Sequence, residues 1–174
     1  MNRFAKIMQV LGWAGAALLA VVWAQGFVVS DGAPELARHS AIAIAAACLC
    51  TLPRFWTIAY LALAARGRRV QRRSTAGSGP SATGKRAAWM RRQALIASML
   101  ALIGLSGSFA LAGATLMHRV SPAAHAAVGF VAIALQIGAL LLERRALRAD
   151  TREMSELARM EAPVRMEKPV SSAS

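Results

Sequence analysis

Four long stretches of the sequence contain almost no charge, and they constrain the fold more than any other feature. They span Ile7–Val29, Ser40–Ala65, Ala94–Met117 and Ala123–Leu142. A bilayer core of about 30 Å is crossed by roughly 20 helical residues, and each stretch meets that length. Because lipid offers the backbone no hydrogen-bond partners, each stretch is predicted to be a helix. Membrane β-strands would alternate apolar and polar residues, and these stretches do not.

The connections between the stretches predict how the helices pair. The first and third connections are short, so the helices that each one joins should be antiparallel neighbours. The sequence therefore predicts an all-α membrane protein in which four transmembrane helices form a bundle of two antiparallel hairpins. Small residues recur every four positions in the third stretch (Gly104, Ser108, Ala112) and in the fourth (Ala134, Gly138), a spacing that lets membrane helices approach closely.

Basic residues are unevenly distributed along the chain, whose net charge is +13. Two precede the first stretch, nine lie between the second and third, and seven follow the fourth, whereas the short connections carry only Arg38 and Arg119. Since cytoplasmic segments are enriched in Lys and Arg, both termini and the middle connection are predicted to be cytoplasmic. We expect a multi-pass protein of the bacterial inner membrane.

The basic segments also suggest which partners the chain has. Anionic lipid headgroups are expected at the cytoplasmic face, where each nearby Lys or Arg contributes about 1 kcal/mol. Nucleic acid is not expected as a partner, because the basic middle connection has one aromatic residue, Trp89, and no recognisable binding module.

Three segments outside the four stretches are predicted to differ in their local structure. Residues 66–92 are expected to form a flexible cytoplasmic loop, because they include the low-complexity segment Gly77–Gly84. Residues 143–161 are predicted to be a separate cytoplasmic amphipathic helix, since apolar residues recur there on one face. Residues 162–174 are expected to be a disordered tail.

Two features of the first and second stretches leave alternatives. The first stretch is also compatible with a cleaved signal peptide, but its length and the sequence Val22-Trp23-Ala24 favour a retained helix. Cys48 and Cys50 are two positions apart and point to different sides of a helix, so no disulfide is expected between them.

The three histidines, His39, His118 and His125, all fall at the outer ends of their stretches. Imidazoles from adjacent helices at one depth are the ligands that haem iron or a metal ion needs. His39 and His125 would be the natural pair for haem b, and all three would bind a metal ion. The alternative is that they are ordinary interfacial residues.

Arg54 lies inside the second stretch, about 16 Å from its cytoplasmic end. An arginine at the centre of a span costs about 2.5–3.5 kcal/mol on insertion scales, so a partner is expected. No Asp or Glu lies within a stretch, and Gln136 in the fourth is the expected hydrogen-bond acceptor. A haem propionate, a lipid phosphate or an anionic substrate would also suit Arg54, and a snorkelling side chain is the alternative.

These residues suggest three functions. No catalytic motif or close group of acids and bases occurs in the sequence, so an enzyme is not expected. The first hypothesis is a non-catalytic accessory or scaffolding subunit that binds a larger membrane protein or a second copy of itself. The alternative is a haem-b or metal-binding electron-transfer module that uses His39, His125 and Arg54. The third is a small transporter with Arg54 and Gln136 near the midplane.

Overall fold

The computed structural model describes residues 3–27, 33–74, 82–116 and 121–166, and these residues form four helices. They are α1 (Arg3–Gln25), α2 (Ala33–Ser74), α3 (Ala82–Leu116) and α4 (Pro122–Met166). No strand occurs in these ranges. Each helix is long and apolar enough to cross a membrane, so the predicted all-helical protein with four candidate membrane spans is confirmed.

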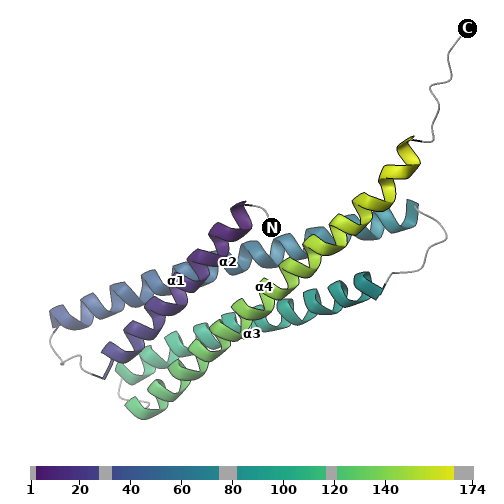
Figure 1. The fold of residues 1–174 in the computed structure, drawn as a ribbon. Coiled ribbons are helices and arrows are strands. Elements are labelled where there is room, and N and C mark those ends of the chain that lie inside the picture. Colours follow the sequence, from purple (N-terminus) through teal and green to yellow (C-terminus); the bar gives the residue numbers. More distant parts are fainter. Residues whose placement is uncertain (1–2, 28–32, 75–81, 117–120, 167–174) are drawn as a thin grey trace, which may run out of the picture.

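The helices differ in length. α2, α3 and α4 contain 42, 35 and 45 residues, which correspond to about 63, 52 and 68 Å at the α-helical rise. These lengths are well beyond the roughly 30 Å of a bilayer core. α1 contains 23 residues, about 35 Å, and it covers only part of the bundle (Figure 1). Three of the helices therefore continue past any membrane that α1 crosses.

The predicted flexible loop of residues 66–92 is largely wrong. α2 continues through Ser74 and α3 already begins at Ala82, so only residues 75–81 lie between them, outside the described residues. Arginine, alanine and glutamine favour helix, and these residue types carry both helices into the basic segment. The linker-like composition that prompted the prediction includes Gly84, which is buried within α3.

The predicted cytoplasmic helix of residues 143–161 is helical, but it is not a separate element. α4 runs without a break from Pro122 to Met166 and joins this segment to the fourth apolar stretch. The helix also includes residues 162–166, so the expectation of disorder from residue 162 is wrong there. Residues 167–174 lie outside the described residues.

The four helices pack unequally. α3 packs most extensively on α4 and α1 on α2, while α1 touches α4 less and α2 touches α3 less still. Consecutive helices run in opposite directions in Figure 1. We call the end of the bundle where α1 and α3 begin the termini end, and the end where α1 and α3 finish the connection end.

The α3–α4 contact follows a seven-residue repeat, which is typical of coiled-coil packing. The buried positions of α3 are three or four residues apart, at Gly84, Ala87, Arg91, Ala94, Ser98, Ala101 and Leu105. Those of α4 repeat every seven residues, as Ala132-Ile133-Gln136, Ala139-Leu140-Glu143 and Ala146-Leu147-Asp150. Five of the seven α3 positions are Gly, Ala or Ser, which lets the two backbones approach closely.

The small residues singled out in the sequence separate into two groups. A Cβ built at Gly104 would lie 2.9 Å from Leu135 Cδ1, so the expected close approach of α3 to α4 is confirmed there. Ala134 and Gly138 are instead exposed, and a Cβ at Gly138 would meet no atom within 4 Å. The expectation that this second pair packs helices is therefore wrong for contacts within the chain.

Candidate functional site

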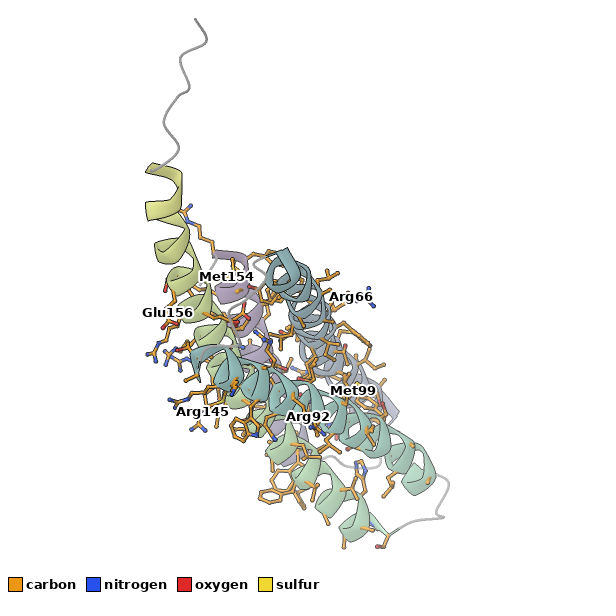
Figure 2. All side chains as sticks on the ribbon, turned by 90° about the vertical axis from the view of Figure 1, so that its right-hand side faces the viewer. Arg66, Arg92, Met99, Arg145, Met154 and Glu156 are labelled. Carbon is orange, nitrogen blue, oxygen red and sulfur yellow. The ribbon has the colours of Figure 1, made fainter. Side chains whose placement is uncertain are left out.

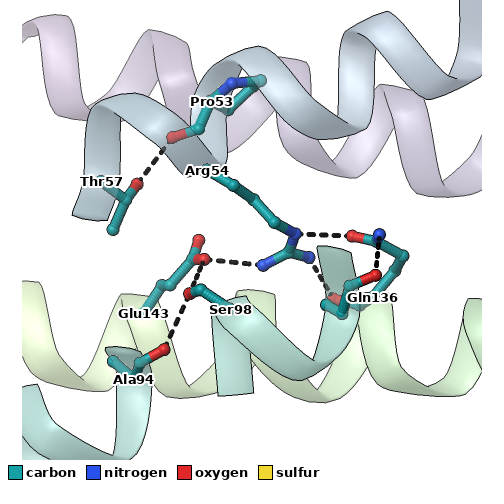
Figure 3. Close-up of polar contacts among 8 residues, drawn as sticks. Pro53, Arg54, Thr57, Ala94, Ser98, Gln136 and Glu143 are labelled. Carbon is teal, nitrogen blue, oxygen red and sulfur yellow. Dashed lines mark hydrogen bonds and ion pairs between the residues drawn. The ribbon is translucent and has the colours of Figure 1, made fainter. Parts of the chain in front are cut away.

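A charged side chain, Arg54, is buried in the bundle and only 1% exposed. It extends from α2 to α4, and each of its three nitrogens donates a hydrogen bond there (Figure 3). Nε donates to Gln136 Oε1 at 2.6 Å, Nη2 donates to the Gln136 backbone oxygen at 2.7 Å, and Nη1 donates to Glu143 Oε1 at 2.6 Å. The expected acceptor, Gln136, is thus confirmed.

The partners of Arg54 are themselves held by α3. Gln136 Nε2 donates to the Ala101 backbone oxygen at 3.1 Å. The Ser98 hydroxyl lies 2.6 Å from Glu143 Oε1 and 2.7 Å from the Ala94 backbone oxygen, so its proton is available to either acceptor. Gln136 and Glu143 are at most 1% exposed. One layer of hydrogen bonds therefore joins α2, α3 and α4.

Glu143 is the partner that the sequence analysis missed. By charge alone the fourth apolar stretch ends at Leu142, which puts Glu143 in the predicted cytoplasmic helix and leaves no acid for Arg54. The structure places Glu143 inside the bundle, in an ion pair with Arg54 at 2.6 Å. The seven-residue spacing of Gln136, Glu143 and Asp150 was the signal that these polar side chains share one buried face.

A second buried ionic layer lies two helical turns closer to the termini end. Arg91 on α3 donates to Asp150 Oδ1 and to Glu153 Oε2, both at 3.0 Å. The Tyr60 hydroxyl on α2 donates to Asp150 Oδ2 at 3.2 Å. Like the first layer, this one joins α2, α3 and α4, so the same three helices are fixed at two levels.

The connection end contains two of the three histidines. His39 comes from the first turns of α2 and His125 from the first turn of α4, and the two imidazoles are close enough to interact electrostatically. The Nδ1 atom of each is buried and has no hydrogen-bond partner. His118 lies outside the described residues.

Aromatic side chains organise the surroundings of these imidazoles. Trp23 Nε1 on α1 donates to the Ala126 backbone oxygen at 2.8 Å, one residue beyond His125. The Trp23 ring contacts Phe27 and Phe130, with ring centroids 5.0 and 6.0 Å apart. The start of α4 is thereby attached to the end of α1.

Of the three histidines expected to bind a metal ion, the described ranges include His39 and His125. In these ranges, no group of three or more His, Cys, Asp or Glu side chains gathers closely enough to hold a metal ion. His39 and His125 therefore stand as a pair. Cys48 and Cys50 are both free, exposed and buried respectively, so the prediction that they form no disulfide is confirmed.

Comparisons with known proteins add no relative to these observations. No protein family, no curated protein and no solved structure matches the chain.

Proposed function

We propose that the chain is a multi-pass protein of the bacterial inner membrane and a non-catalytic accessory or scaffolding subunit of a larger membrane assembly. Its two helix pairs, α1–α2 and α3–α4, would insert as antiparallel hairpins with both chain ends in the cytoplasm. The observation that carries this proposal is the position of Ala134 and Gly138, four residues apart on the outer face of α4. Such pairs let a further helix pack closely. Among the described residues no helix packs on this pair at Gly138, where a Cβ would meet no atom within 4 Å.

The buried polar residues support a structural role over catalysis. Arg54, Glu143, Arg91 and Asp150 are the charged residues that a reaction in the bundle would use, and they are paired with one another across helices. Each of these ions is already hydrogen-bonded to a side chain of opposite charge. This arrangement favours positioning of helices rather than reaction with a substrate.

The distribution of charge on α4 supports the cytoplasmic orientation. Three acids, Glu143, Asp150 and Glu153, face the interior and pair with two arginines. The outer face of the same segment is basic and exposed, as are Arg66 and Arg92 on the neighbouring helices (Figure 2). The exposed basic residues of this segment are Arg144, Arg145, Arg148 and Arg152. They suit anionic headgroups of the cytoplasmic leaflet.

A transporter is the weaker candidate. Arg54 would need to exchange a protein partner for a substrate, yet each of its nitrogens already donates within the bundle. If Arg54→Ala leaves a measured flux unchanged, transport through this residue is excluded.

The scaffolding proposal is tested by isolation from native membranes in a mild detergent. The wild-type chain should co-purify with a stoichiometric protein partner or as a defined homo-oligomer. Gly138→Leu should release the partner without changing the thermal stability of the chain, because a Cβ at Gly138 meets no atom within 4 Å. Ala17→Leu, at an exposed position of α1, is the matched control and should retain the partner.

Three outcomes contradict the proposal. A wild-type chain that purifies alone as a monodisperse monomer is not an accessory subunit. If Gly138→Leu and Ala17→Leu lose the partner equally, Gly138 is not the contact with the partner. Destabilisation of the isolated chain by Gly138→Leu shows that this residue packs within the bundle after all.

A further inference from the structure

Two unpartnered nitrogen atoms distinguish the connection end from the remainder of the interior. Across the described ranges, His39 Nδ1 and His125 Nδ1 are the buried side-chain nitrogen or oxygen atoms that have no hydrogen-bond partner. Buried polar groups are normally satisfied, since leaving one unpaired costs about 1–3 kcal/mol. Both exceptions are imidazoles, and they come from two different helices.

The two imidazoles are held close to each other by three helices. Both lie at the connection end, His39 near the start of α2 and His125 in the first turn of α4. A Cβ built at Gly26, just after α1, would lie 3.8 Å from His39 Cε1. Trp23 on α1 is attached to the Ala126 backbone oxygen beside His125. The end of α1 therefore contacts the start of both histidine-bearing helices.

The chemistry of a neutral imidazole limits what can fill this position. With its proton on Nε2, the ring presents a bare lone pair at Nδ1. Two such lone pairs attract a cation, and imidazole nitrogen suits zinc, copper, nickel and iron. Protonation of both rings would turn each Nδ1 into a donor, but it would place two positive charges at the same end of the bundle.

We propose that His39 and His125 form a two-imidazole binding site for a transition-metal cation at the connection end of the bundle. The cation is either a bare late first-row ion, whose remaining ligands come from solvent, or the iron of haem b, whose remaining ligands come from the porphyrin. This site goes beyond the proposed scaffolding role, and it uses none of the residues that carry that role.

The test is titration of purified, metal-free chain in detergent with three separate probes: cuprous ion, zinc ion and hemin. The wild-type chain should bind one of them at about one equivalent per chain. A Soret band on hemin addition identifies haem, and stoichiometric metal in elemental analysis without that band identifies a bare ion. His39→Gln and His125→Gln should each weaken binding at least about tenfold, because each removes one of two ligands.

Two further variants separate ligation from folding. Cys48→Ser removes an exposed soft ligand from the same helix as His39 and should leave binding unchanged. Thermal unfolding of each histidine variant without metal should match the wild type, because Gln fills a similar volume and imidazole Nδ1 has no partner to lose.

The proposal is overturned if none of the three probes binds near stoichiometry, or if the His39→Gln/His125→Gln double variant binds as the wild type does. If the wild-type chain purifies without a protein partner but still binds metal, the scaffolding proposal is excluded and the metal site is retained. The two proposals are therefore distinguishable.

Discussion

Both halves of the bundle have an apolar core, and the half toward the termini end adds buried ion pairs to it. Toward the termini end, Arg54 pairs with Glu143 and Arg91 pairs with Asp150 and Glu153. Toward the connection end, the core is a cluster of apolar side chains from all four helices. Its buried members are Leu19, Ala46, Cys50, Leu105 and Ile133.

This difference shows where the helix register is specified. Lipid tails are as apolar as leucine, so apolar contact alone discriminates weakly between alternative helix partners in a membrane. A buried charge strongly disfavours any register that leaves it unpaired, as polar layers do in coiled coils. Arg54 therefore fixes the position of α2 against α4. The other contact of α2 across the bundle, with α3, is sparse.

The largest expected effect is loss of the Arg54 layer. Arg54→Met leaves Glu143 buried without its cation, and breaking a buried ion pair in this way costs about 3–5 kcal/mol. We expect the free energy of unfolding, measured by SDS titration in mixed micelles, to fall by that amount. An unchanged unfolding midpoint would show that water or lipid solvates Arg54 and that the layer does not hold the helices.

A double substitution separates pairing from apolar packing. Arg54→Met combined with Glu143→Leu removes both charges and should recover most of the lost stability, since apolar replacement of a whole buried pair is often close to neutral. If the double variant is as unstable as the single one, the contribution of Arg54 comes from its bonds to Gln136 rather than from Glu143.

Packing at the connection end predicts a smaller effect, and two glycines of α1 test it. A Cβ at Gly15 would lie 2.8 Å from the backbone of Leu49 and Cys50 on α2, which cannot rotate away. Gly15→Ala should therefore separate α1 from α2 and cost about 1–3 kcal/mol, as overpacking does.

Gly12 provides the matched control for Gly15. A Cβ at Gly12 would meet Leu140 Cδ2 at 2.7 Å, and this methyl group is the far end of a side chain that can rotate. The gain in helix propensity from Gly to Ala, up to about 1 kcal/mol, should offset the adjustment. Equal costs for Gly12→Ala and Gly15→Ala in the same SDS titration would contradict the packing of α1 against the α2 backbone.

The sequence predicted the number and approximate cores of the helices, because absence of charge over about 20 residues is a direct requirement of the bilayer. It also predicted the contact of Arg54 with Gln136. It failed at the helix ends, because a hydropathy boundary was treated as the end of a helix and of the bundle. Glu143 lies one residue beyond that boundary, and the core repeat of α4 continues past it to Glu153.

The sequence could not decide which small residues pack within the chain. Gly104 and Gly138 lie in equally suggestive patterns, yet Gly104 lies against Leu135 and Gly138 is exposed. The seven-residue repeat tells the two glycines apart only when one buried position of the repeat is known. Gln136, Glu143 and Asp150 give that position once they are assigned to one buried face. The lack of a partner for His39 Nδ1 depends on how the other helices pack around it and has no local signature in the sequence.

The smallest expected effect concerns Tyr60, at the edge of the second ionic layer. Its hydroxyl donates to Asp150 Oδ2 at 3.2 Å, but Asp150 also receives Arg91 at 3.0 Å through its other oxygen. Tyr60 is 38% exposed, so water can replace the lost donor. Tyr60→Phe keeps the stacked contact with the Trp56 ring and should cost only about 0.5 kcal/mol in the SDS titration.

The size of that small effect decides whether the termini end acts as one unit. If each ionic layer is satisfied separately, the costs of Tyr60→Phe and Arg54→Met should add in the double variant, because the layers are about 10 Å apart along α4. A cost for Tyr60→Phe that approaches that of Arg54→Met would mean that the layers are coupled through α4. The termini end would then unfold as one cooperative unit.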